Sequence, residues 1–182
     1  MTDEAPAAEQ PEAASMRYSS PPGALLHDAT PAAPERFLIV PVLAAEPIAG
    51  AGADAPRFLL VRWADWPQPA MLSLAPPAAH DTLDAAVADL LLARLQLTST
   101  GPARVSEHRI PVRMGAARFG FTGTGWLRAV LAPVTGEPKP DALLAGADVL
   151  TLDEALAALS TEVERMLLRD AAELAAKLGD RG

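Results

Sequence analysis

The sequence predicts an α/β (α+β) domain, in which strands and helices share one core. Leucine-rich and β-branched runs of strand length stand on both sides of one amphipathic helix, and two helical segments close the chain. Its 182 residues are enough for one domain with a sizeable core. Half of the residues are hydrophobic but only 4% are aromatic, so we expect a mainly aliphatic core.

The first 35 residues differ in composition from the rest. They are rich in alanine and proline and have too little hydrophobic periodicity to offset the entropy of ordering. We therefore expect a disordered tail over residues 1–35 and a single domain over residues 36–182.

Three strands are expected before the helix. Residues 36–43 and 57–63 are rich in residues that favour strands, and residues 71–75 form a short apolar piece. Pro41 has no backbone donor for a central ladder, which indicates an edge strand or a bulge.

The central helix is expected over residues 81–96. Asp81 is a good N-cap and Asp84 lies at the capping-box distance from it. Apolar residues then recur at helical spacing: Leu83, Val87, Leu90, Leu91 and Leu95.

Residues 103–114 and 126–135 are expected to form a hairpin around a glycine-containing loop. Arg113 and Arg118 flank this loop and are the candidates for binding an anion. A short strand over residues 148–150 should follow, then a helix opened by the capping box of Thr151 and Glu154. The last helix is expected to begin near Ser160 and to pack through one apolar stripe: Val163, Met166, Leu167, Leu174 and Leu178.

Charge and composition exclude several function classes. A formal net charge of -8 disfavours binding to nucleic acid, which depends on clustered lysines and arginines. The chain has no cysteine, which fits a reducing compartment. No apolar run reaches membrane-spanning length and the first residues do not resemble a signal peptide, so we expect a cytoplasmic protein that does not enter a membrane.

The order of these elements resembles the Nudix hydrolase family over about residues 36–178. The Nudix box of that family runs glycine, five residues, glutamate, seven residues, then Arg-Glu-aliphatic-x-Glu-Glu-x-Gly-aliphatic. Aligned on this chain, Ala75 replaces the glycine and Asp81 the first glutamate, while the aliphatic positions are kept at Leu91 and Leu97. The resemblance implies an α/β/α sandwich with a mixed β-sheet between helices.

The box is degenerate in this chain. Leu90, Ala93 and Arg94 replace the three core glutamates, Asp89 replaces the arginine, and Gln96 replaces the glycine. In an active member these carboxylates hold divalent cations that polarise a diphosphate and activate water. Leucine and alanine supply no oxygen ligand, and an arginine repels a cation. We therefore expect no metal site, no catalytic residue and no cofactor on this helix.

Two other features of the helix have alternative interpretations. Asp81, Asp84 and Asp89 form a displaced metal cluster in one interpretation, but capping and the helix dipole already account for Asp81 and Asp84. Leu90 and Leu92 fall where the resembled helix shows polar residues. A partner subunit, the tail segment with Leu25 and Leu26, an apolar ligand or the molecule's own core would each cover them.

The sequence thus leaves two main hypotheses. We favour a non-catalytic Nudix-like domain that works as a ligand-binding or protein-interaction module, as a homo-oligomer or with a protein partner, and with a nucleotide-like ligand. The alternative is a Nudix-type hydrolase of a nucleoside-diphosphate-linked substrate with relocated Mg²⁺ or Mn²⁺ ligands. The glutamates considered for that role are Glu107, Glu137, Glu162 and Glu164. A third, weaker interpretation is another small α+β domain.

Overall fold

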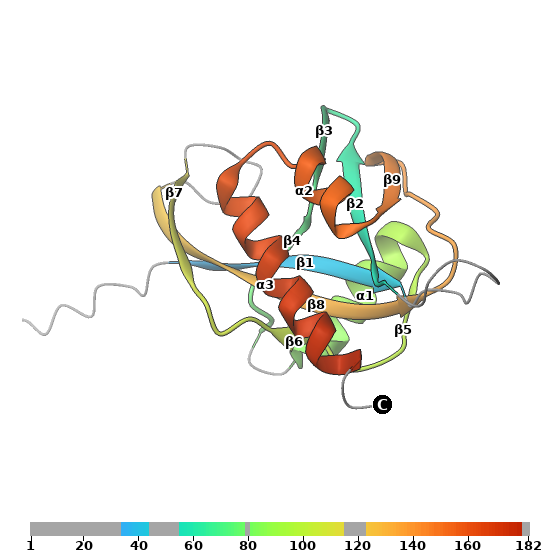
Figure 1. The fold of residues 1–182 in the computed structure, drawn as a ribbon, viewed down its shortest axis with the longest axis horizontal. Coiled ribbons are helices and arrows are strands. Elements are labelled where there is room, and N and C mark those ends of the chain that lie inside the picture. The colour runs from blue at the N-terminus through green and yellow to red at the C-terminus, as the bar shows by residue number, and fades with distance from the viewer. Residues whose placement is uncertain (1–33, 44–54, 79–80, 115–122, 180–182) are drawn as a thin grey trace, which may run out of the picture. The chain divides into compact units, whose positions relative to one another are not determined.

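A mixed β-sheet forms the middle layer of the computed structural model, which describes residues 34–43, 55–78, 81–114 and 123–179 (Figure 1). The nine strands of this sheet are β1 (Glu35–Leu43), β2 (Arg57–Trp63), β3 (Trp66–Ala70), β4 (Leu72–Leu74), β5 (Thr98–Ser99), β6 (Arg104–Val105), β7 (Ile110–Met114), β8 (Gly123–Thr135) and β9 (Leu144–Leu150). The described helices are α1 (Leu83–Leu95), α2 (Leu152–Ala158) and α3 (Glu162–Gly179). Apart from Pro34 and Glu35, the predicted tail lies outside the described residues.

The sheet is built around β1 and β8. These two strands run parallel from Glu35, opposite Trp126, to Leu43, opposite Val134. The remaining pairs are antiparallel: β1 pairs with β4 and β2, β2 also pairs with β3 and β9, and β8 pairs with β5, β6 and β7. The mixed sheet expected from the sequence is therefore confirmed.

Helices cover both faces of the sheet, as Figure 1 shows for α2 and α3 in front of the sheet and α1 behind it. Alternate residues of a strand point to opposite faces. Leu38 and Val40 of β1 accordingly pack in the cluster that includes Leu167 and Leu168 of α3, and Phe37 and Ile39 pack in the cluster that includes Val87, Leu91 and Leu95 of α1. The α/β/α layering is the expected one.

Pro41 does not mark an edge strand, which was one of the two expectations for it, because β1 is an interior strand. Pro41 stands opposite Ala132 of β8. On the other side of β1, the partner is β4 up to Ile39 and β2 from Val42 onward. The proline thus falls where β1 changes neighbours, a place at which a missing donor costs little.

Three further details differ from the sequence-based expectation. Strand β3 contains Pro67 and Pro69, which were expected only to lead into a strand; it pairs with β2 alone, as an edge strand permits. The expected strand over residues 103–114 is broken into β6 and β7. Met166, expected to pack, is 46% exposed on α3.

Candidate functional site

Helix α1 is the element on which the resemblance places a functional site. Its N-cap is Thr82 and not Asp81, because the Thr82 side chain accepts a hydrogen bond from the Ala85 amide at 3.2 Å. Asp84 lies in the first turn and accepts a hydrogen bond from the Ala103 amide at 2.8 Å, which ties the start of β6 to the helix. Asp81, the expected N-cap, therefore precedes the actual N-cap by one residue, and Asp84 falls one residue before the capping-box position, which Ala85 occupies.

The α1 residues that the sequence comparison aligned with the box lie in different surroundings. Leu90 is partly buried and packs against the hydrophobic cluster between α1 and the sheet, here called the α1-side core. Leu92, by contrast, is 59% exposed. Asp89 and Ala93 are exposed, as is Asp81 before the helix. The two leucines proposed to meet a partner are thus not equivalent, because the molecule's own core already covers part of Leu90.

Arg94 forms an ion pair with Asp141 in the connection between β8 and β9. Its Nη1 donates to Asp141 Oδ2 at 2.6 Å. Backbone bonds reinforce the contact, since the amides of Asp141 and Lys139 donate to the carbonyl oxygens of Arg94 and Leu95 at 2.9 and 2.7 Å. The hydrogen bond from Arg94 lowers the pKa of the Asp141 carboxyl. This guanidinium is therefore part of the link between α1 and the next loop.

Gln96 ends α1 in a left-handed backbone conformation. It has φ 55° and ψ 30°, the conformation in which glycine usually ends a helix. Its amide bonds to the carbonyl oxygens of Leu91 and Leu92. A glutamine in this place carries a steric cost that glycine would not.

Of the two candidate anion-binding arginines, one lies within the described residues. Arg113 is exposed on β7, opposite Thr124 of β8, and Arg118 lies outside the described residues. The four glutamates of the alternative hypothesis have separate surroundings. Glu162 pairs with Arg165 and Arg169 on α3, Glu164 is buried and accepts a hydrogen bond from Thr161, and Glu107 and Glu137 are exposed.

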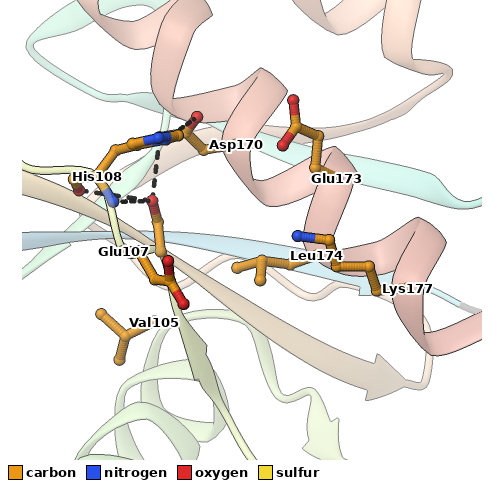
Figure 2. Close-up of a pocket in the computed structure, with 8 residues that line it drawn as sticks. Val105, Glu107, His108, Asp170, Glu173, Leu174 and Lys177 are labelled. Atoms are coloured by element: carbon orange, nitrogen blue, oxygen red, sulfur yellow. Dashed lines mark hydrogen bonds and ion pairs between the residues drawn. The ribbon is translucent and has the colours of Figure 1, made fainter.

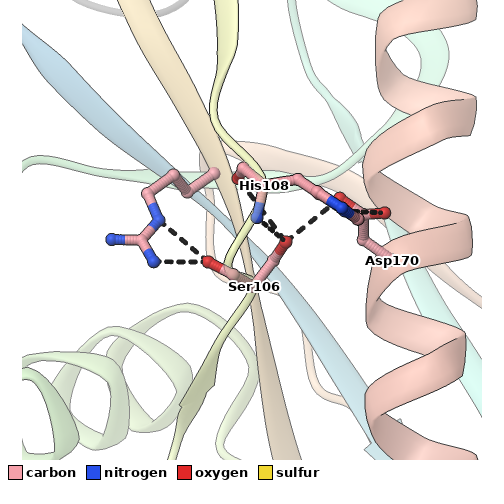
Figure 3. A network of polar contacts seen from close by, with 4 residues as sticks. Ser106, His108 and Asp170 are labelled. Carbon is pink, nitrogen blue, oxygen red and sulfur yellow. Dashed lines mark hydrogen bonds and ion pairs between the residues drawn. The ribbon is translucent and has the colours of Figure 1, made fainter.

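A polar cluster that was not expected from sequence patterns joins the β6–β7 connection to α3 (Figure 3). Ser106 Oγ donates to Asp170 Oδ2 at 3.0 Å, and His108 Nδ1 lies 3.0 Å from Asp170 Oδ1. Ser106 Oγ in turn accepts a hydrogen bond from the His108 amide at 3.1 Å. The hydrogen bond and charge of Asp170 raise the pKa of His108.

These three residue types also make up hydrolytic triads, but the arrangement here differs. In a triad the serine hydroxyl donates to the imidazole, whose other nitrogen meets the carboxylate. Here the Ser106 hydroxyl and the His108 imidazole both meet the Asp170 carboxylate, and Ser106 is only 3% exposed. The cluster therefore holds the β6–β7 connection in place and does not prepare a nucleophile.

A small open pocket of about 120 Å³ lies beside this cluster (Figure 2). Its lining mixes both signs of charge, with Glu107 and Glu173 against Lys177. Volumes of several hundred Å³ are typical of pockets that bury a small molecule. At about 120 Å³, this pocket is smaller than that range.

Comparisons with known proteins bear on the fold. No protein-family model and no curated protein sequence matches the chain. Solved structures do: a mutT/nudix family protein from Listeria innocua matches with a TM-score of 0.56 and 15% identity, covering 82% of this chain and 98% of its own. The C. elegans Ap4A hydrolase in a binary complex gives 0.56 and 13%, covering 79% and 98%.

The NUDIX domain of Shewanella oneidensis NrtR, complexed with ADP ribose, gives a TM-score of 0.55 and 13% identity, covering 78% of this chain and 88% of its own. The chain has the Nudix hydrolase fold. At 13–15% identity, this likeness concerns the fold alone. Among the described helices of this Nudix fold, none combines the length and apolar character that crossing a bilayer requires.

The three α1 positions that the sequence comparison aligned with the box glutamates do not fit a divalent cation. Two of the aligned positions, Leu90 and Ala93, have no side-chain oxygen, and the third is the cationic Arg94. Within the described ranges, no group of three His, Asp or Glu side chains is placed to hold a metal ion.

Proposed function

We propose that this Nudix-fold domain works without metal-dependent hydrolysis on α1 and binds a ligand or a protein partner instead. The observation that supports the proposal is that two of the residues aligned with box glutamates have structural roles. Arg94 is held by Asp141 at 2.6 Å, and Leu90 packs against the α1-side core. We interpret the segment that contains these residues as a degenerate Nudix box.

The physical argument rests on charge. Hydrolysis of a diphosphate by a metal ion requires several carboxylate oxygens close together, so that the cation is held and water is activated. In this chain the guanidinium of Arg94 puts a positive charge at that place, and its partner Asp141 is committed to it. Ligand binding does not require those carboxylates.

A nucleotide-like small molecule is the ligand class that we propose. Two proteins of similar fold have names that point to this class, since one is an Ap4A hydrolase and the other was seen with ADP ribose. A homo-oligomer or a protein partner is the second class, supported by Leu92, which is 59% exposed on α1. A cytoplasmic location remains a prediction from the sequence.

The alternative is a hydrolase with relocated metal ligands. It would require two or more of the four glutamates to converge on one ion. Glu162 would have to leave Arg165 and Arg169, and Glu164 would have to give up Thr161, with which it opens α3. These existing partners favour the non-catalytic proposal.

Metal binding and turnover test the proposal together. Mg²⁺ and Mn²⁺ are titrated into the full chain by calorimetry, and phosphate or pyrophosphate release is then screened with nucleoside-diphosphate-linked compounds. The C. elegans Ap4A hydrolase, assayed on Ap4A, is the positive control for the screen. We expect no saturable heat and no release. Tight metal binding with turnover would overturn the proposal, and substituting glutamine for each of the four glutamates would then locate the ligands.

A further inference from the structure

The face of the sheet that α1 covers extends past this helix toward β7. Phe37 of β1 points to the α1 side, and its partner Arg128 of β8 shares that face. Trp126 is two residues before Arg128 and therefore points the same way. In Figure 1, β7 lies at the left of the view and α1 toward the right.

Strand β7 adds a second row of side chains to this outer face. Pro111 stands opposite Trp126 and Arg113 opposite Thr124, so both partners point to the α1 side as well. Pro111, Arg113 and Thr124 are exposed. Within the described ranges Arg113 makes no ion pair, and its guanidinium is open to a ligand.

Arg109 is held over the same face by two contacts. Its Nε lies 3.2 Å from Glu35 Oε1, and its guanidinium carbon lies 5.2 Å from the centre of the Trp126 ring. The ion pair uses one edge of the guanidinium, and the ring fixes its plane. The side chain is still 51% exposed, which leaves the terminal nitrogens accessible.

The charge of this face is opposite to that of the chain. Among the described residues that strand register places on this face, Arg109, Arg113 and Arg128 stand with the carboxylate of Glu35, while the whole chain carries a formal net charge of -8. Arg128 Nε donates a hydrogen bond to the Ser106 carbonyl oxygen at 2.9 Å. Because this donor is already used, the main contribution of Arg128 to the face is its positive charge. A local cationic face on an acidic protein attracts an anionic ligand.

We propose that this outer face binds the diphosphate of a nucleotide-like ligand, with Arg109 and Arg113 donating to the phosphate oxygens. Guanidinium groups bind phosphate through paired hydrogen bonds, and a guanidinium that is already oriented loses little entropy on binding. Thr124, opposite Arg113, supplies a further hydroxyl. The inference rests on the proposed ligand-binding function and gives it a place on the sheet that is separate from α1.

The test uses ADP-ribose as the probe, titrated into the full chain by calorimetry with EDTA present, so that hydrolysis is excluded. We expect saturable binding that inorganic pyrophosphate displaces and that salt weakens. Arg113→Ala and Arg109→Ala should each weaken binding by about tenfold or more, the usual loss for a charged hydrogen bond. Arg169→Ala, which removes the same charge from α3, should leave it unchanged.

Three results would overturn the inference: no binding of ADP-ribose, no displacement by pyrophosphate, or equal affinity of Arg113→Ala, Arg109→Ala and the native chain. Circular dichroism melts of each variant identify any loss of folding, and Arg113→Ala is the more secure variant because its side chain is exposed and makes no ion pair within the described ranges. These results are distinct from the result that would overturn the proposed function, because that function is overturned only by metal binding with turnover.

Discussion

Arg94 and Asp141 are joined twice, through their side chains at 2.6 Å and through the Asp141 amide and the Arg94 carbonyl oxygen at 2.9 Å. The double connection fixes the loop between β8 and β9 against the last turn of α1. A cation on α1 would have to compete with this guanidinium, which already satisfies the nearby carboxylate. The structural role of Arg94 and the proposed lack of hydrolysis are therefore two consequences of one contact.

The Arg94 contact predicts a pH dependence on the acid side. Because the pKa of Asp141 is lowered from its ordinary value of 3.8, its contribution to stability is present above pH 3.8 and is lost as the pH falls through the folded-state pKa. Asp141→Asn should therefore unfold at lower urea concentration at pH 7 and lose less stability on acidification. Asp89→Asn, an exposed change on α1, is the control. Parallel acid curves for native and Asp141→Asn proteins would contradict this account.

The Ser106, His108 and Asp170 cluster predicts the opposite pH dependence. The pKa of His108 is raised above its ordinary 6.5, so its contribution to stability is complete below pH 6.5 and declines as the pH rises through the folded-state pKa. An NMR titration of the imidazole should show the raised pKa. Asp170→Asn should bring it back toward 6.5, and Glu173→Gln should lower it less, because the Asp170 hydrogen bond is the largest cause. A His108 pKa unaffected by Asp170→Asn would refute the contact.

Gln96→Gly should stabilise the protein by about 0.5–1 kcal/mol. The left-handed conformation of Gln96, with φ 55°, costs a residue with a side chain roughly 1–2 kcal/mol, and glycine recovers part of this against its greater freedom in the unfolded chain. Ala93→Gly within α1 is the matched control and should destabilise by about 1 kcal/mol. Urea unfolding measures both, and a destabilised Gln96→Gly would show that the conformation is unstrained.

Leu90 and Leu92 should respond differently to a charge. Leu90→Glu puts a carboxylate against the α1-side core and should cost about 1–3 kcal/mol of stability. Leu92→Glu, at a side chain that is 59% exposed, should change stability by less than about 0.5 kcal/mol. If Leu92 meets a second copy, this variant should instead shift the oligomeric state in sedimentation. An unchanged sedimentation profile would remove Leu92 from any self-contact.

Sequence reasoning succeeded where local patterns determine structure. The capping box of Thr151 and Glu154 opens α2 as expected, because both hydrogen bonds join residues three apart. The apolar residues Val87, Leu91 and Leu95 occupy the buried face of α1, as their spacing predicts. The N-cap was misplaced by one residue, since the neighbours Asp81 and Thr82 are both residue types that cap helices well.

The site could not be predicted to the same degree, because its contacts join distant parts of the chain. Arg94 and Asp141 are 47 positions apart, and His108 and Asp170 are 62 apart. No local spacing indicates either pair. Arg113 was singled out beside a glycine-containing loop, but its place on the same face of the sheet as Trp126 follows from strand register, which only the sheet reveals.

We claim above all that α1 has no binding site for a divalent cation. The most direct test adds Mn²⁺ to the isotope-labelled protein and follows its amide NMR signals. Bound Mn²⁺ broadens the signals of nearby amides. We predict that the signals from residues 82–97 broaden no more than those of other exposed acidic segments and do not saturate. Selective, saturable loss of the α1 signals at low Mn²⁺ concentration would contradict the account.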